Sequence, residues 1–328
     1  MENFPEAPFP ELIDSSKIST FDSCEAKFYF SYVHHLSPLA ISPDLHAGAA
    51  FSTAMEVART AIYKHSMTTE EAVAQGVRAM VTYWGDFEPP HGHNKTLEAM
   101  IGALASYFEE YPPETDPLRP LIKENGEPAV EFSFSIPTLI PHPVSGDPIM
   151  YCGRFDMLAD FDGMFLCVED DKTTKSFYMN WAESWHMRGQ FMGYCYAAQQ
   201  HGYDVSRALI RGIAILKTKY NHAQAIVEFQ PWMIEKWWQD TNRKIERMVS
   251  AWKNDHYIRS FADACSAYSG CEFKPHLCIN QYPEQHLNQF QIQEWNPLEK
   301  NPTWPLAGPK YETIGNFAEL KEEFNDGS

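Results

Sequence analysis

The chain has 328 residues, of which 44% are hydrophobic and 14% aromatic, so it has enough apolar residues to fold around a core as one large domain or two ordinary ones. A net charge of −18 counts against a protein that binds nucleic acid over its whole surface, because affinity for a phosphate backbone comes mostly from Lys and Arg. No apolar run is long enough to cross a bilayer, and the N-terminus lacks the pattern of a signal peptide. We therefore expect a soluble cytoplasmic protein with no membrane association.

The first third of the chain predicts helices. Apolar residues recur at helical spacing, and breaks rich in Pro and Gly separate the runs. Ser19 or Thr20 is a good N-cap for the first run. The expected segments are a flexible lead over 1–14 and helices over about 19–34, 47–65, 69–85 and 94–110.

The middle of the chain predicts strands interleaved with helices. A helix rich in small and aromatic residues follows the first three strands, and Pro231 opens a second one. Strands flanked by helices indicate an α/β core. The expected strands are 129–136, 149–160, 164–171, 207–217 and 223–228, with a long connection at 137–148, helices at 181–200 and 231–253, and an irregular remainder at 254–328.

Two carboxylates and a lysine fall on neighbouring predicted strands. Asp156 closes the segment Gly-Arg-Phe-Asp, and Asp170 begins Asp-Asp-Lys on the next strand. Side chains alternate along a strand, so Asp170 and Lys172 point to one face and Asp171 to the other. A hairpin through 160–163 brings Asp156 to the same place. Two carboxylates bind a hard divalent cation, and the set suits metal-assisted hydrolysis of a phosphodiester, although Asp-x-Lys also occurs by chance on solvated faces.

Gln190 and Tyr194 are four residues apart on a predicted helix and so share one face. The order Gly-Arg-Phe-Asp, Asp-x-Lys, Gln-x-x-x-Tyr resembles the RecB-like branch of the PD-(D/E)XK nuclease superfamily. The resemblance implies that Asp156 and Asp170 bind Mg2+ or Mn2+, together with the backbone carbonyl of Asp171, and that Lys172 is the catalytic lysine. It also implies that Gln190 and Tyr194 are catalytic-site residues that contact DNA.

The N-terminal motifs agree with this resemblance except at one position. Residues 15–30 are similar to the opening helix of these nucleases, and Gly48 to Glu56 is similar to their Gly-x-x-x-His-x-x-x-Glu helix. Glu56 matches and is expected to reach the metal through a water. Ser52 stands where the family has a histidine ligand, which keeps a catalytically degenerate protein as the alternative.

Four of the seven cysteines form a second pattern, in which one early cysteine accompanies a late group. This pattern resembles the iron–sulfur staple of several RecB-like nucleases, including AddB-type and CRISPR-associated members, and four thiolates are the usual ligands of a [4Fe–4S] cluster. Zn2+ bound by thiolates with His276 or His286, and unliganded cysteines, remain as alternatives. The four cysteines are Cys24, Cys265, Cys271 and Cys278.

The resemblance implies a restriction-endonuclease-like fold, with a mixed central sheet flanked by helices, over residues 15–280. Its parts are a helical block at about 15–125, a catalytic core at about 126–253 and the cysteine staple at 265–278, before an irregular acidic tail at 281–328. The implied function is a metal-dependent DNA exonuclease of recombination, repair or phage replication, working with a single-strand annealing protein or another recombination protein. The expected DNA-binding residues, besides Gln190 and Tyr194, are Lys17, Lys27, Arg154, Lys175 and Arg188.

Overall fold

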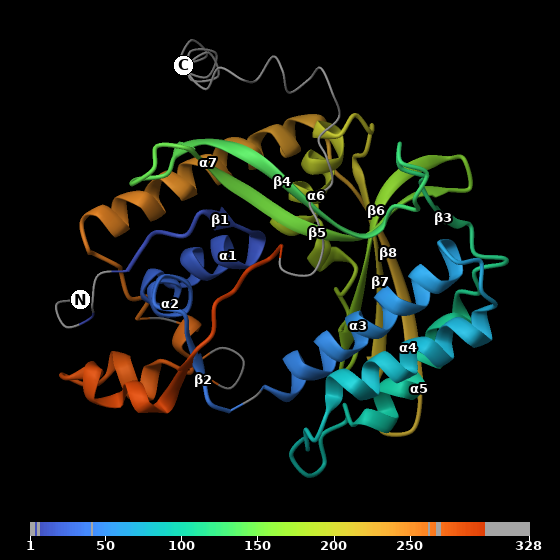
Figure 1. Cartoon of the computed structure of the whole chain (residues 1–328), viewed down its shortest axis with the longest axis horizontal. Coiled ribbons are helices and arrows are strands. Elements are labelled where there is room, and N and C mark those ends of the chain that lie inside the picture. Colours follow the sequence, from blue (N-terminus) through green and yellow to red (C-terminus); the bar gives the residue numbers. More distant parts are fainter. Residues whose placement is uncertain (1–3, 5–6, 41, 262, 267–269, 299–328) are drawn as a thin grey trace. The chain divides into compact units, whose positions relative to one another are not determined.

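The computed structural model describes residues 4, 7–40, 42–261, 263–266 and 270–298 (Figure 1). The chain divides into two compact units. Unit 1 comprises Met1–Ala40, Ser133–Gly153 and Glu235–Ser328, and unit 2 comprises Ile41–Phe132 and Arg154–Ile234. The units do not coincide with the predicted helical block and core, because the strands β4 (Val130–Pro141) and β5 (Pro148–Phe161) contribute residues to both.

Unit 2 contains a mixed sheet. The second half of β5 pairs antiparallel with β3 (Leu118–Pro120) and with β6 (Phe165–Thr174). β6 pairs parallel with β7 (Arg207–Ile215), which pairs antiparallel with β8 (Tyr220–Glu228). The predicted β5–β6 hairpin is confirmed: Asp162 and Gly163 have φ angles of 51° and 70°, and the Gly163 N–H donates to Asp160 over 3.0 Å.

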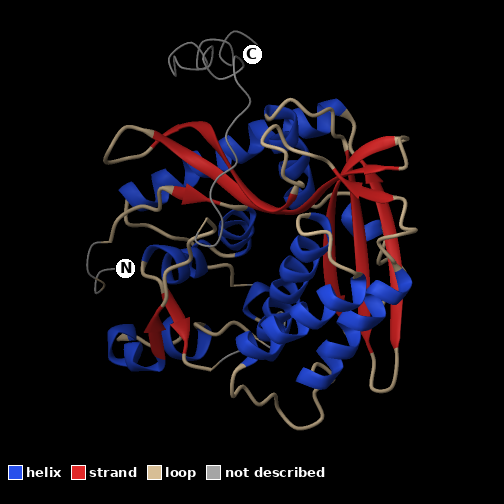
Figure 2. Cartoon of the chain, turned by 45° about the vertical axis from the view of Figure 1, so that its right-hand side comes forward, coloured by secondary structure: helices blue, strands red, loops and turns tan. Residues whose placement is uncertain are grey.

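Three helices pack together against one side of this sheet (Figure 2). They are α3 (Pro43–Tyr63), α4 (Thr69–Trp84) and α5 (Leu97–Glu110). Their small and aromatic residues form one apolar core with Ile213 and Ile215 of β7. At Gly76 a Cβ atom would lie 2.8 Å from the Ala54 carbonyl oxygen, so only glycine permits the close approach of α3 and α4.

Helix α6 (Gly189–Gln200) lies on the opposite face of β6 from α3. Asp170 contacts Gln190 of α6, whereas the next residue, Asp171, contacts Arg59 of α3. Since successive side chains of a strand point to opposite faces, the two helices sandwich this strand. The expected fold class, a mixed sheet flanked by helices, is thereby confirmed.

Unit 1 is built around α7 (Pro231–Lys253) and the first half of β5. The short strand β1 (Leu12–Ile13) runs parallel to β5, and Tyr151 of β5 packs edge-on against Trp237 at 5.3 Å. Three short elements follow β1: α1 (Ser15–Ser23), α2 (Glu25–Phe28) and the π-helix η1 (Tyr29–Val33). The strand β2 (Leu36–Pro38) pairs with β9 (Phe290–Ile292), and short helical turns lie at Asp263–Cys265, Lys274–Cys278 and Pro283–Gln289.

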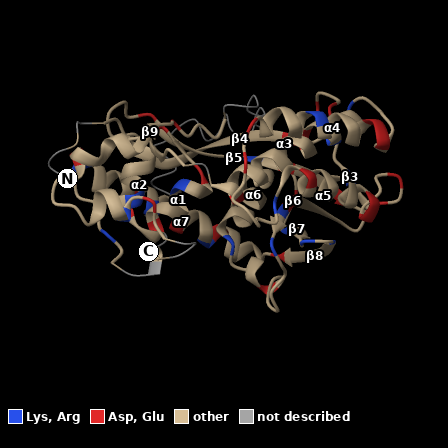
Figure 3. Cartoon of the chain, turned by 90° about the horizontal axis from the view of Figure 1, so that it is seen from below, with Lys and Arg blue, Asp and Glu red and all other residues tan. Residues whose placement is uncertain are grey.

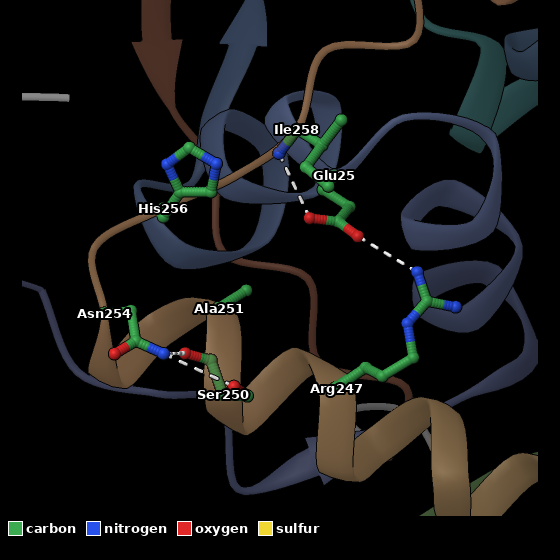
Figure 4. Close-up of a pocket in the computed structure, with 7 residues that line it drawn as sticks. All are labelled: Glu25, Arg247, Ser250, Ala251, Asn254, His256 and Ile258. Carbon is green, nitrogen blue, oxygen red and sulfur yellow. Dashed lines mark hydrogen bonds and ion pairs between the residues drawn. The ribbon is translucent and has the colours of Figure 1, made fainter.

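A cavity of about 390 Å³ opens between α7 and the segment that follows it (Figure 4). In its wall, the Glu25 carboxylate accepts from the Ile258 N–H at 3.0 Å and from Arg247 at 3.1 Å. Among the described residues that line it, Glu25 is the one carboxylate, and it is already paired with Arg247. The lining residues are Glu25, Arg247, Ser250, Ala251, Asn254, His256 and Ile258.

Several local expectations were wrong. The first helix begins at Ser15, where Asp14 is its cap, accepting from the Lys17 N–H at 2.8 Å, and it breaks at the extended residue Cys24. β1 lies inside the stretch 1–14 that was expected to be a flexible lead. β4 continues through Pro137, which is tolerated because β4 pairs with β5 alone among the strands that the structure describes and is therefore an edge strand of that part of the sheet.

The helix expected over 181–200 begins only at Gly189, after a 3-10 turn at Glu183–Trp185. The β2–β9 pair lies partly in a region expected to be irregular, because a three-residue strand has no readable periodicity. No helix among the described residues is long and apolar enough to span a membrane.

Candidate active site

The β5–β6 hairpin brings the two predicted carboxylates together in unit 2. The register that pairs Met157 with Glu169 places Asp156 beside Asp170 one step further along the strands. The Asp171 backbone N–H donates to the Asp156 carboxylate over 3.2 Å. This contact ties the end of one strand to the other, so both carboxylates face the same point.

Asp170 contacts two side chains of the predicted motifs, and a third side chain reaches it through one of these two. One carboxylate oxygen forms an ion pair with the Lys172 ammonium, and the other accepts from the Gln190 amide over 3.2 Å. The same amide donates to the Tyr194 hydroxyl over 3.0 Å. The structure therefore brings together Asp156, Asp170, Lys172, Gln190 and Tyr194, as the sequence predicted.

The surroundings of Asp170 disfavour its negative charge. Its side chain is 2% exposed, and burial raises its pKa to about 7, with Asp156 adding to the rise and Lys172 opposing it. Burial alone would lower the pKa of Lys172, but the carboxylates of Asp170 and Asp156 outweigh it and raise that pKa. The direction of this shift favours the charged ammonium of Lys172.

Arg154 balances a second set of acids beside Asp156. It lies on the same face of β5 as Asp156, and its guanidinium reaches Glu131 at 3.1 Å and Glu56 at 3.3 Å. It also donates to the Ser52 hydroxyl over 3.3 Å. Ser52 occupies the position where the RecB-like nucleases have a histidine. Its hydroxyl contacts the Arg154 guanidinium.

Glu131 is a feature that the sequence analysis missed. Its side chain is buried, and its φ of 46° lies in the left-handed region that disfavours residues other than glycine. Burial raises the pKa of Glu131, and the nearby charge of Asp156 adds to the rise while Arg154 opposes it. The only sequence signal was a charged residue inside the apolar run Val130–Phe134.

A buried polar group on the back of β6, here called the Arg59 cluster, was also missed. It consists of Arg59, Tyr107, Glu169 and Asp171. The Arg59 guanidinium lies 2.8 Å from Glu169 and 2.7 Å from Asp171, and it donates to the Tyr107 hydroxyl at 3.0 Å. Burial raises the pKa of Asp171, with Glu169 adding to the rise and Arg59 opposing it. The direction of this shift shows that the cluster disfavours a second negative charge beside Glu169.

The expected DNA-binding lysines and arginines have different surroundings. Lys17 is buried and its ammonium donates to the Leu12 carbonyl at 2.7 Å, so it does not face solvent as we expected. Lys27 forms an ion pair with Glu272, whereas Arg188 is exposed beside the ring of Trp185.

Lys175 is also exposed and pairs with Asp44. Basic residues also lie on β6 and β7 (Figure 3). One of them, Arg211 of β7, is buried and pairs with Asp116 at 2.7 Å, so it does not face solvent.

The four predicted cysteines all belong to unit 1, and all are free and partly buried. The Cys271 N–H donates to the Cys265 carbonyl over 3.2 Å. Burial raises the pKa of Cys278, and the nearby thiols of Cys271 and Cys24 contribute to the rise. Among the residues that the structure describes, no three His, Cys, Asp or Glu side chains are arranged to hold a metal ion, either here or beside Asp170.

A carboxylate pair and a lysine on neighbouring strands of a mixed sheet suit the hydrolysis of phosphodiesters. A family model described as the PD-(D/E)XK nuclease superfamily matches residues 15–278. The chain therefore belongs to this superfamily of nucleases.

Comparisons with individual proteins add little to the family match. One solved structure that resembles the chain is a protein from Eubacterium rectale described as a "putative exonuclease", with 11% identity, a TM-score of 0.44 and coverage of 78% of this chain and 86% of that one. Another is SSO0001, with 12% identity, a TM-score of 0.27 and coverage of 61% and 74%. Both likenesses are distant, and no curated protein matches the chain.

Proposed function

We propose that the chain is a divalent-metal-dependent deoxyribonuclease of the RecB-like branch. The observation that carries the proposal is the meeting of Asp156, Asp170 and Lys172 with the Gln190–Tyr194 pair. The donor set fits Mg2+ or Mn2+, because burial and the nearby Asp156 carboxylate raise the pKa of Asp170, and a hard cation would relieve the repulsion between the two carboxylates. The Asp171 carbonyl, Glu56 through a water, and further waters would complete the shell.

The roles of the side chains follow from their contacts. A bound divalent cation would supply charge neutralisation and an acidified water. Lys172, protonated and on the same face, stabilises charge that develops on the phosphate. Gln190 orients the Asp170 carboxylate, and Tyr194 orients Gln190.

The Gln190 contact leads to a measurable prediction. Replacing Gln190 with Ala removes the amide that orients Asp170, so the cleavage rate should fall by about 10- to 100-fold, the usual cost of losing a residue that orients a ligand. Cleavage of labelled DNA at saturating metal measures the loss. Tyr194→Phe removes only the hydroxyl and should have a smaller effect, and a Gln190→Ala enzyme as active as wild type would contradict this role.

Metal binding should depend on pH through Asp170. Its pKa of about 7 in the metal-free fold means that a proton occupies the carboxylate below that pH and must leave when a cation binds. Mn2+ affinity should therefore rise as pH increases from about 6 to 8, with proton release on binding. Calorimetry in buffers of different ionisation enthalpy measures both, and an affinity constant across this range would contradict the assignment.

The test of the proposed function is cleavage of end-labelled linear single- and double-stranded DNA with Mg2+ or Mn2+, beside EDTA. Metal-dependent cleavage that releases label from an end supports the exonuclease. We propose that this exonuclease acts in recombination, repair or phage replication, with a single-strand annealing protein or another recombination protein as its partner. DNA binding without cleavage would favour the second candidate, a degenerate binding or assembly protein. The contact between Ser52 and Arg154 is the observation that favours that candidate.

The cysteine group is proposed to hold a [4Fe–4S] cluster that fastens the C-terminal segment to the first helices. Phe273 packs on Phe30 at 5.3 Å and Glu272 pairs with Lys27 at 3.1 Å, so the two segments already meet beside Cys24 and Cys271. Four thiolates match the ligand number of the cluster.

Protein purified without oxygen should be brown and should lose its colour in Cys271→Ser. The matched control is Cys195→Ser, which changes a buried cysteine of unit 2 and should leave the colour intact. Absorbance and iron content are the readouts. Colourless wild-type protein with one zinc per chain would replace the cluster with Zn2+, and protein with neither metal would remove the site.

A further inference from the structure

A group of basic side chains lies in unit 2 just beyond the C-terminal end of β6. Three of them face a single carboxylate, that of Asp44 in the first turn of α3. The Lys175 ammonium lies 3.0 Å from this carboxylate, the Lys95 ammonium 3.4 Å, and His93 Nε2 3.8 Å. Three positively charged or donor groups therefore converge on one small anion.

The loop that carries two of these groups is fixed by its own hydrogen bonds. The Lys95 N–H donates to His93 Nδ1 over 3.2 Å, so the neutral ring carries its proton on Nε2, the nitrogen that faces Asp44. The intervening Asn94 donates to the Ile215 carbonyl of β7 over 3.4 Å. The donors are therefore in place before a ligand arrives, which lowers the entropy cost of binding.

Lys95 is a buried cation, whereas its partner is not buried. Its side chain is 6% exposed, and its ammonium also bonds the Thr173 hydroxyl of β6 at 3.3 Å. Burial lowers the pKa of Lys95, and the negative charge of Asp44 offsets part of that decrease. The Asp44 side chain is 47% exposed, so it can turn into solvent and leave both lysines to another anion.

The group lies at the C-terminal end of β6. Lys95 bonds the Thr173 hydroxyl, and Lys175 is the residue that follows the strand. Since side chains alternate along a strand, Thr173 points to the opposite face of β6 from Lys172. The group is therefore separate from the side chains that meet at Asp170.

We propose that His93, Lys95 and Lys175 form a subsite for one phosphate of the DNA strand. Asp44 occupies the subsite as an internal anion until DNA displaces it. The inference rests on the proposed function, since it takes DNA to be the substrate. A phosphodiester fits because its two free oxygens accept hydrogen bonds from several charged donors at once.

Binding of a fluorescein-labelled oligonucleotide in EDTA, followed by anisotropy at several salt concentrations, tests the subsite without cleavage. Asp44→Asn should bind about five- to tenfold tighter at 0.1 M salt, because the phosphate no longer has to displace an internal carboxylate. Lys175→Gln should bind weaker by a similar factor.

The matched controls come from an exposed ion pair elsewhere in unit 2, Lys64 with Glu127. Glu127→Gln and Lys64→Gln change the net charge equally and should alter affinity by less than about twofold. An Asp44→Asn protein that binds no tighter than Glu127→Gln would overturn the subsite, while wild-type cleavage would leave the nuclease proposal standing. Wild-type protein that neither binds nor cleaves DNA would overturn both.

Discussion

Asp170→Asn is expected to slow DNA cleavage by about 1,000-fold or more. In the proposed function a bound cation would contribute several kcal/mol of transition-state stabilisation, and about 1.4 kcal/mol corresponds to each factor of ten. Asn keeps the shape of the side chain and the contact with Gln190 but cannot supply the negative charge that holds the cation. Single-turnover cleavage at saturating Mn2+ is the measurement.

The same substitution should leave the fold intact. The pKa of Asp170 is higher in the folded protein, about 7, than in an unfolded chain, about 3.9, so the folded state loses stability as pH rises through that interval. The uncharged Asn side chain removes this loss of stability. Lys172 would lose its ion pair with Asp170, but its side chain is 32% exposed, so water can solvate the ammonium. The free energy of unfolding at pH 8 should be unchanged or higher. Asp160→Asn, at the hairpin turn of the same strand, is the control, and a fully active Asp170→Asn enzyme would rule out the site.

Arg59→Met is expected to lower the free energy of unfolding of unit 2 by about 3–5 kcal/mol. Removing one partner of a buried ion pair leaves the other charge without compensation in a medium of low polarity. Here Glu169 would lose its guanidinium inside the sheet, on the back of the strand that carries Asp170. Urea unfolding followed by the change in midpoint, at constant slope, measures the loss.

Two comparisons separate this effect from a general loss of charge. Lys64→Met removes an exposed cation just after the same helix and should cost less than about 1 kcal/mol. Combining Arg59→Met with Glu169→Gln and Asp171→Asn removes the uncompensated charge, so part of the lost stability should return. Equal stability of Arg59→Met and Lys64→Met would contradict the role of the Arg59 cluster.

The contacts that the sequence predicted and the structure contains are those set by short-range geometry. Asp170 and Lys172 share a face because a strand repeats every two residues, and Gln190 and Tyr194 share one because a helix brings positions four apart together. The hairpin turn at Asp162–Gly163 then fixes the register that brings Asp156 to them. None of these relations requires knowledge of the rest of the chain.

The residues that were missed or misjudged depend on contacts between distant segments. Arg59 meets Glu169 across 110 residues, and no periodicity in α3 marks it as different from a surface arginine. Lys17 was expected to face DNA but is buried, and the strand β9 exists only through its pairing with β2.

The sequence by itself therefore determined the α/β class, the carboxylate–lysine motif and its approximate placement on two strands and a helix. Only the tertiary structure decided which charges are buried, that Arg154 lies against Ser52 with Glu131 and Glu56, and that Lys95 and Lys175 converge on Asp44. The physical reason is that the energy of a charge depends on its solvation and on its nearest partners. Both are set by packing between segments far apart in the chain rather than by local residue order.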